Sequence, residues 1–501
     1  DAVTPGVAVG SSFFAITGAS ISPSSSISFS LSGNSFFNNS FSFILLPVYT
    51  YYLNTADDYG EITVIFSYLV FMNVVLSYGM ETSFFRFYNS EENKRNVVQT
   101  SMISILWSSV GFLILALLTR NSIANFINVD VEYITYVVWI LVLDALVVVP
   151  FSKLRVNQRP VRFAVIKIAN TAINLGLNIF FLVYLPKLAH QNPDSFFDSI
   201  YYDNFQVGYI FVSNLIASLL TFLYFLPNYI KLNWSFDSEL WRRMMKYSLP
   251  VLVAGIAFAV NEHFDKILLE HILPENIAKH EVGIYGACYK LGLFMVLFST
   301  AFRLGIEPFF FSYAKNENAP KTYANITKYF VIFGSLILLG VIVFADVLKI
   351  LMIKKQVYWD GMVVVPLIIL ANFFLGIYNN LSVWYKLTDK TKMGAYISIV
   401  GAVLTLVLNF VLIPKYSYMG SAIATLVAYG TMMIVSYILG KKYYYIPYDM
   451  KKIGTYLGAS VSLSYVYFYH FLIQLYLSQN LFSKNKTNIR HPTSVIGQKN
   501  K

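Results

Sequence analysis

Four ionisable residues lie close together in the apolar stretch 248–270, which is long enough to cross a membrane. Glu262, Lys266 and Glu270 follow one another at steps of four residues, and Asp265 lies one position beside them. On a helix the Lys266 ammonium can therefore pair with either glutamate. A charge at mid-bilayer costs roughly 2.5–3.5 kcal/mol on insertion scales, so it needs a partner or a watery cavity. A structural pair does not need four such groups, and we interpret Glu262, Asp265 and Glu270 as candidates for ion coupling.

Two further apolar stretches carry cations that could bind an anion. Arg303 and Glu307 are four residues apart, so they either neutralise each other or leave Arg303 to bind a ligand. Glu81 and Arg86 occupy a similar place in an earlier stretch. A guanidinium fork suits phosphate oxygens, so Arg86 and Arg303 are candidates for a cationic entrance. Lys290 and Lys266 are expected deeper in the membrane, along the same cavity.

Polar residues form a row on one face of the predicted helix 161–185, at steps of three and four residues: Lys167, Asn170, Thr171, Asn174 and Asn178. Such side chains either hold helices together in lipid or bind sugar hydroxyls in a cavity, and the sequence leaves both open. For Asp144 and Lys167 we expect a structural pair. The chain shows no Walker loop and no Cys/His spacing typical of a metal site, so we expect no enzyme activity, no cofactor and no metal.

The elements that position these residues are long apolar stretches. Hydrophobic residues make up 56% of the chain and charged residues 13%, which is typical of a polytopic membrane protein. A membrane-crossing helix needs ~20 apolar residues. We predict an all-α fold with about thirteen spans, at 30–53, 60–85, 98–118, 133–152, 161–185, 206–227, 248–270, 283–305, 329–352, 362–385, 394–414, 418–440 and 453–477.

Basic residues alternate between the connections of these spans. The connections 86–97, 153–162, 228–247, 306–328, 386–393 and 441–452 hold 21 Lys and Arg, whereas the six intervening ones hold 6. Basic residues near span ends stay on the cytoplasmic side. The pattern predicts a bacterial inner-membrane protein with a cytoplasmic amino terminus. The net charge of +11 therefore lies in short loops, which argues against nucleic-acid binding, and the single Cys288 excludes a disulfide framework.

The spans fall into two groups of six. We predict a first lobe at 43–227, an amphipathic cytoplasmic linker at 228–247, a second lobe at 248–440 and an additional span at 441–477. Residues 1–42 form an atypical serine-rich segment, and 478–501 a polar basic tail.

The two lobes resemble each other in sequence. Residues 60–72 match 283–295, including the first glycine and a closing Phe-Met. The endings Gly79-Met-Glu and Gly305-Ile-Glu correspond, as do Leu177-Asn-Ile and Leu408-Asn-Phe. Six spans in each unit make the repeat parallel. Transporters are commonly built from duplicated halves with the substrate site between them, near the midplane.

Several motifs resemble the polysaccharide exporter family that contains the Wzx-type oligosaccharide flippases, closest to sequences of Bacteroidota type. They are Leu46-Pro-Val-Tyr, Asp58-Tyr-Gly, Tyr78-Gly-Met-Glu-Thr-Ser-Phe-Phe-Arg-Phe, Gly283-Ile-Tyr-Gly-Ala-Cys-Tyr-Lys-Leu, Ala301-Phe-Arg and Glu307-Pro-Phe-Phe-Phe. The family belongs to the superfamily of multidrug, oligosaccharidyl-lipid and polysaccharide exporters. The resemblance implies two six-helix lobes around a central cavity. It also implies export of a polyprenyl-pyrophosphate-linked oligosaccharide for O-antigen-like or capsule-like surface polysaccharide. Partners would be membrane lipids and the polymerase and glycosyltransferases of the same pathway.

Two other functions stay open. A cation-coupled drug exporter of the same superfamily would favour a cavity of acids and aromatic residues, whereas this chain adds Arg86, Lys290 and Arg303. A membrane-integral glycan polymerase would need a large external loop. The best candidate is the short segment 186–204, with Asp194 and Asp198.

Overall fold

The computed structural model describes residues 43–314, 316–388 and 390–467, and all the regular elements in these ranges are helices. Ten helices are long and apolar enough to cross a membrane, and a shorter apolar helix spans Phe43–Tyr52. The predicted all-α membrane fold is confirmed. The predicted stretches 30–53 and 453–477 lie partly outside the described residues.

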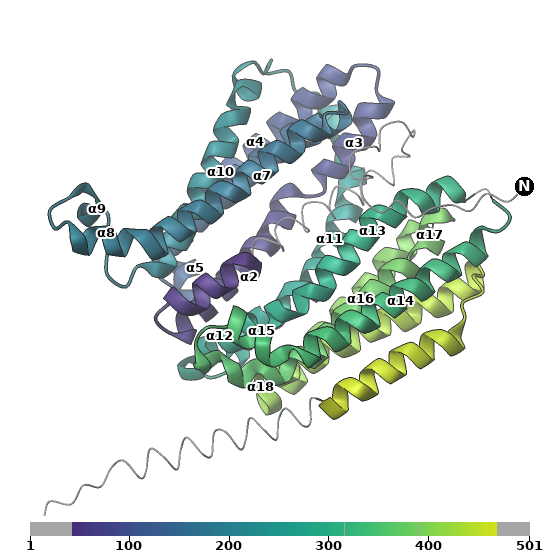
Figure 1. Ribbon diagram of the computed structural model, residues 1–501. Coiled ribbons are helices and arrows are strands. Elements are labelled where there is room, and N and C mark those ends of the chain that lie inside the picture. The colour runs from purple at the N-terminus through teal and green to yellow at the C-terminus, as the bar shows by residue number, and fades with distance from the viewer. Residues whose placement is uncertain (1–42, 315, 389, 468–501) are drawn as a thin grey trace, which may run out of the picture.

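The first lobe follows the order of the chain. It contains α2 (Ala56–Ser77), α3 (Met80–Ser90), α4 (Lys94–Leu118), α5 (Arg120–Ile127), α6 (Val131–Val156), α7 (Pro160–Ile179), the π-helical turn η1 (Phe180–Tyr184), α8 (Leu185–Gln191), α9 (Phe196–Ser199) and α10 (Gln206–Ile230). In Figure 1 these helices run from purple to blue.

The second lobe, teal to yellow in Figure 1, starts with the 35-residue helix α11 (Ser238–Ile272). It continues through α12 (Glu275–Tyr289), η2 (Lys290–Gly292), α13 (Leu293–Tyr313), α14 (Ala319–Val343), α15 (Ala345–Met352), η3 (Gln356–Val364), α16 (Val365–Leu381), α17 (Val383–Leu387) and α18 (Thr391–Tyr443). A last described helix covers 450–467. The chain reverses within α18 at Ser417 (φ 49°, ψ −135°), so the Ser421 hydroxyl reaches Asn409 Oδ1 at 2.9 Å. The predicted spans 394–414 and 418–440 are the two arms of this hairpin.

The three basic connections 86–97, 153–162 and 228–247 meet at one end of the molecule. Tyr88 donates a hydrogen bond to Asn157 at 3.0 Å, and Arg243 pairs with Glu91 at 2.8 Å. We call this the basic end. At the opposite end, Asn54 donates to Asn204 at 3.1 Å. For these connections, the alternation of charge along the sequence is therefore also an alternation in space.

The first turns of α11 are the predicted linker segment, and they continue without interruption into the membrane. Asp237 caps the helix, because its carboxylate accepts the backbone N–H groups of Glu239 and Leu240. Leu240 and Met244 are buried. This part of α11 packs on α3 and α4 of the first lobe, and its later turns pack both on α2 of the first lobe and on α18 of the second.

Two spans are interrupted inside the membrane. Between α2 and α3, Tyr78 (φ 33°) and Gly79 (φ 70°) adopt left-handed conformations. A side chain at position 79 would place its Cβ 2.8 Å from the carbonyl oxygen of Ser248, so glycine allows α11 to approach. In the second lobe, the 3₁₀ turn η2 separates α12 from α13 and begins at Lys290.

Candidate functional site

The ionisable cluster on α11 is organised around a pair of adjacent residues. Lys266 Nζ lies 2.9 and 3.0 Å from the two carboxylate oxygens of Asp265. Tyr285 of α12 donates to the same carboxylate at 2.7 Å, and the Tyr289 ring centroid lies 3.7 Å from the ammonium. The expected pairing of Lys266 with a glutamate four residues away was wrong. Lys266 and Asp265 are both buried and compensate each other's charge.

The two glutamates of this helix therefore keep their carboxylates for other contacts. Glu262 is partly buried, and its carboxylate lies 3.8 Å from His263 Nε2. It is also close enough to Arg303 for their charges to interact. Glu270 is buried, and its Oε2 has no hydrogen-bond partner within the described residues. Burying a carboxylate oxygen without a partner is costly, which makes Glu270 a candidate for protonation or cation binding.

Arg303 also keeps unused hydrogen-bonding capacity. Its Nε is buried and finds no partner in the described part of the chain. Glu307, which could have neutralised it, instead accepts from Lys386 Nζ of α17 at 2.6 Å. The self-neutralised pair is therefore not formed. Lys290 makes no ion pair with a described residue, and the nearby charge that acts on it is the repulsive one of Lys266.

Arg86 lies at the surface of the basic end. Its guanidinium carbon is 4.4 Å from the Tyr247 ring centroid and 6.0 Å from that of Phe87. Arg243 lies 5.8 Å from the same Phe87 ring. Among the described contacts none joins Arg86 to Arg303, so the two arginines of the predicted entrance belong to separate surroundings.

An ion pair occurs at corresponding places in the two lobes, and in each lobe it joins two segments of that same lobe. Glu81 at the start of α3 pairs with Arg155 near the end of α6, and Glu307 pairs with Lys386 in the corresponding place of the second lobe. Sequence reasoning missed Arg155 and Lys386 as partners because both were counted with the basic connections. The signal that could have found them is the repeat, since each follows the fourth span of its lobe.

The polar row on α7 mainly connects helices. Asn170 donates to the Ala217 carbonyl at 3.0 Å and to Thr221 Oγ1 at 2.9 Å, both on α10. Asn178 is buried and accepts from the Tyr49 hydroxyl at 2.9 Å. Of the alternatives, Asn170 and Asn178 act as helix contacts in this structure.

The remaining members of the row have fewer partners outside their helix. The Asn174 side-chain oxygen accepts from Asn178 at 2.6 Å. Lys167 Nζ lies 4.5 Å from the centroid of the Phe151 ring. Asp144 accepts from Ser218 at 2.8 Å and interacts with Lys167 only through its charge. The expected direct bond between Asp144 and Lys167 is replaced by these contacts.

Two other expectations concern catalysis. Within the described residues no group of three or more His, Cys, Asp or Glu side chains could hold a metal ion. In the segment 186–204, the Asp198 carboxylate accepts from the backbone N–H of Asp194 at 3.3 Å. Both aspartates thus take part in a local turn.

The chain resembles known proteins in sequence and in fold. The model of the polysaccharide biosynthesis protein family matches residues 27–296, more than half of the chain. The MatE model matches residues 250–411. An uncharacterized membrane protein of Methanocaldococcus jannaschii is 20% identical over 192 residues, which are 38% of this chain and 44% of that relative. The match thus spans less than half of the relative's length.

Two solved structures share the fold along most of the chain. The lipid II flippase MurJ in an inward closed conformation has a TM-score of 0.69 and 15% identity, covering 93% of this chain and all of MurJ. A multidrug resistance MATE family transporter of the MOP superfamily, in an inward-facing conformation, has a TM-score of 0.65 and 12% identity. That match covers 84% of this chain and 97% of the transporter. At these identities the likeness establishes the fold.

Proposed function

The chain belongs to the polysaccharide biosynthesis protein family, and on that premise we propose that it moves a polyprenyl-pyrophosphate-linked oligosaccharide across the bacterial cytoplasmic membrane. The proposal includes alternating access of the two lobes, with the basic end in the cytoplasm. The product would enter assembly of a surface polysaccharide, together with the polymerase and glycosyltransferases of that pathway. These finer points rest on the resemblance and on the charge pattern.

One observation carries the substrate class. On the continuous path from α12 to α13, neither Lys290 nor Arg303 forms an ion pair with a described residue, whereas Lys266 is paired with Asp265 and Lys386 with Glu307. Arg303 interacts with Glu262 only through their charges. Two intramembrane cations on one span that form no direct ion pair among the described residues favour a mobile anion such as a pyrophosphate. Arg86 would act earlier, at the surface of the basic end. The oligosaccharide would lie between the lobes while the polyprenyl tail stays in lipid.

Energy for this movement need not come from ATP. A pyrophosphate with about two negative charges gains roughly 4–5 kcal/mol per 100 mV on moving away from an interior-negative side. Glu262 and Glu270 are the proposed ion-coupling groups. Asp265, which the sequence placed with them, is held by Lys266 and Tyr285 and would instead fix the position of α11.

The test uses purified protein in mild detergent and native mass spectrometry of bound lipid. We expect a polyprenyl-pyrophosphate glycan to copurify with the wild type and to be lost from Arg303→Gln and Lys290→Gln. The matched control is Lys321→Gln, which removes one positive charge from an exposed residue of the same lobe. Retention of the glycan by both test variants would refute the anion path.

A second candidate, a cation-coupled drug exporter, is favoured by the acidic groups Glu262 and Glu270. It predicts that cationic dyes bind to the wild type and are released by Glu262→Gln or Glu270→Gln. Dye binding without any copurifying glycan would favour this candidate over the first.

A further inference from the structure

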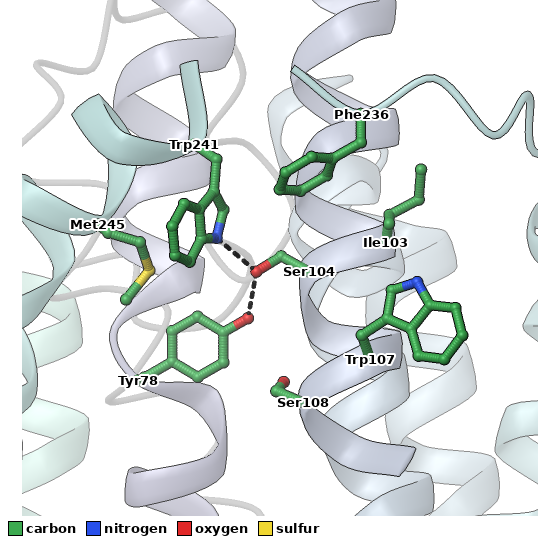
Figure 2. Close-up of a pocket in the computed structure, with 8 residues that line it drawn as sticks. All are labelled: Tyr78, Ile103, Ser104, Trp107, Ser108, Phe236, Trp241 and Met245. Atoms are coloured by element: carbon green, nitrogen blue, oxygen red, sulfur yellow. Dashed lines mark hydrogen bonds between the residues drawn. The ribbon is translucent and has the colours of Figure 1, made fainter. Parts of the chain in front are cut away.

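A pocket of about 600 Å³ lies between α4 of the first lobe and the first turns of α11, near the basic end. Figure 2 shows that α4 supplies one wall and that Tyr78, Phe236, Trp241 and Met245 complete it. The Ser104 hydroxyl forms its centre, because both Trp241 Nε1 and the Tyr78 hydroxyl lie 2.8 Å from it. These bonds join the polar groups of Ser104, Trp241 and Tyr78 to one another, and most of the remaining lining is apolar or aromatic.

The pocket opens towards lipid. Trp107, on its rim, is 63% exposed, and the same face of α4 continues with the exposed residues Ile114, Leu115 and Leu118. Between them, Gly111 has open space where a side chain would be. Large apolar side chains exposed in such a row face the bilayer rather than water. The pocket is therefore the end of a lipid-facing groove.

Two cations on the neighbouring face of α11, next in sequence to the pocket residues Trp241 and Met245, have no acidic partner among the described residues. Arg242 and Lys246 are exposed and lie one helical turn apart on α11, and neither forms an ion pair with a described residue. On a helix their face continues with Leu249 and Val253, which are 51% and 53% exposed. Their neighbour Arg243 differs, since it is paired with Glu91. Arg242 and Lys246 thus lie where lipid head groups meet the apolar surface.

We propose that this pocket binds an anionic phospholipid, with one acyl chain among the aromatic side chains and its phosphate held by Arg242 and Lys246. The volume is in the range of small-molecule sites, and the two positive charges select an anionic head group. The inference goes beyond the transported substrate. Because Trp241 and Met245 belong to α11 and Ser104 to α4, the lipid would hold the first turns of α11 on the first lobe.

The experiment measures the affinity of the full chain for phosphatidylglycerol by native mass spectrometry, with phosphatidylcholine as the neutral comparison. Removing both charges in Arg242→Gln/Lys246→Gln should weaken phosphatidylglycerol binding about 30-fold, if each contributes as a basic residue near an anionic surface. Ser108→Phe fills the pocket from its rim and should weaken the binding of both lipids. The control Lys441→Gln/Lys442→Gln removes two exposed charges at the end of α18 and should bind as the wild type does.

Three results would overturn the proposal. One is an unchanged affinity in both test variants, and another is equal loss in the Lys441/Lys442 control. The third is binding of a polyprenyl phosphate, in place of phospholipid, that is lost in the same variants, since this would assign the pocket to the carrier lipid. Wild-type thermal stability of each variant confirms that a lost affinity is not lost folding.

Discussion

Gly60 of α2 and Gly283 of α12 pack against each other where the two lobes meet, and they do so reciprocally. A Cβ on Gly60 would lie 1.9 Å from the Lys279 carbonyl oxygen, and a Cβ on Gly283 would lie 1.9 Å from the Ala56 carbonyl oxygen. Each glycine thus approaches the residue four positions before the other. This reciprocity is the sequence repeat expressed as an approximate two-fold axis through the contact.

We expect valine at either glycine to force α2 and α12 apart, because its Cβ would overlap a backbone carbonyl that cannot move alone. Cys288, the single cysteine, is buried on α12 and contacts the Tyr358 carbonyl at 3.2 Å. Its labelling by a maleimide should be slow in the wild type and faster in Gly60→Val and Gly283→Val. Gly340→Val is the control, since nothing lies within 4 Å of that position. Wild-type labelling in both test variants would contradict a tight contact.

Replacing one member of the ion pair between Glu307 and Lys386 should destabilise the protein more than replacing both. Both side chains are largely buried, at 8% and 23% exposure, so Glu307→Gln leaves an uncompensated ammonium. Breaking a buried pair in this way costs about 3 kcal/mol. Thermal unfolding in detergent should show a larger loss for each single variant than for Glu307→Gln/Lys386→Met. Additive losses would argue against coupling.

Asn170 should act on stability more than on substrate binding. It makes two hydrogen bonds to α10, and interhelical bonds of this kind contribute about 0.6 kcal/mol in membranes. Asn170→Ala should lower the unfolding temperature while glycan copurification persists. In Asn174→Ala, whose side chain bonds only within α7 among the described contacts, the unfolding temperature should change less. A loss of bound glycan without a loss of stability in Asn170→Ala would reverse this assignment.

The stability that Asp237 gives to the start of α11 should depend on pH. Hydrogen bonds from the Leu240 backbone and the Asn96 side chain hold the pKa of the Asp237 carboxyl below its usual value. A carboxyl with a lowered pKa stabilises the fold above its unfolded pKa, and this contribution is lost as the pH falls through the folded pKa. Amide exchange over 238–242 should therefore accelerate, after correction for intrinsic rates, below about pH 4. Asp237→Asn should remove this dependence.

Long-range repetition was easier to predict than local partners. The spans follow from hydropathy and the correspondence of Gly60 with Gly283 follows from the repeat, which are properties of many residues together. The contact between the two glycines was not predicted. The partner of Lys266 was not predictable from helical spacing, because the adjacent Asp265 reaches it once Tyr285 orients the carboxylate. Lys386 was assigned to a connection by its charge, although its long side chain returns to Glu307. The interruption at Lys290 has no signature in hydropathy.

The continuity of α11 relates this protein to the thickness of its membrane. Thirty-five helical residues extend about 52 Å, whereas the hydrocarbon core of a bilayer is about 30 Å thick. Its first turns bond to the first lobe, and its later turns bond to both lobes, through Tyr68 of α2 and Ser398 of α18, so α11 cannot slide to suit a thinner bilayer without disturbing its contacts with both lobes. Tilt of this single helix therefore links the relative orientation of the lobes to hydrophobic mismatch.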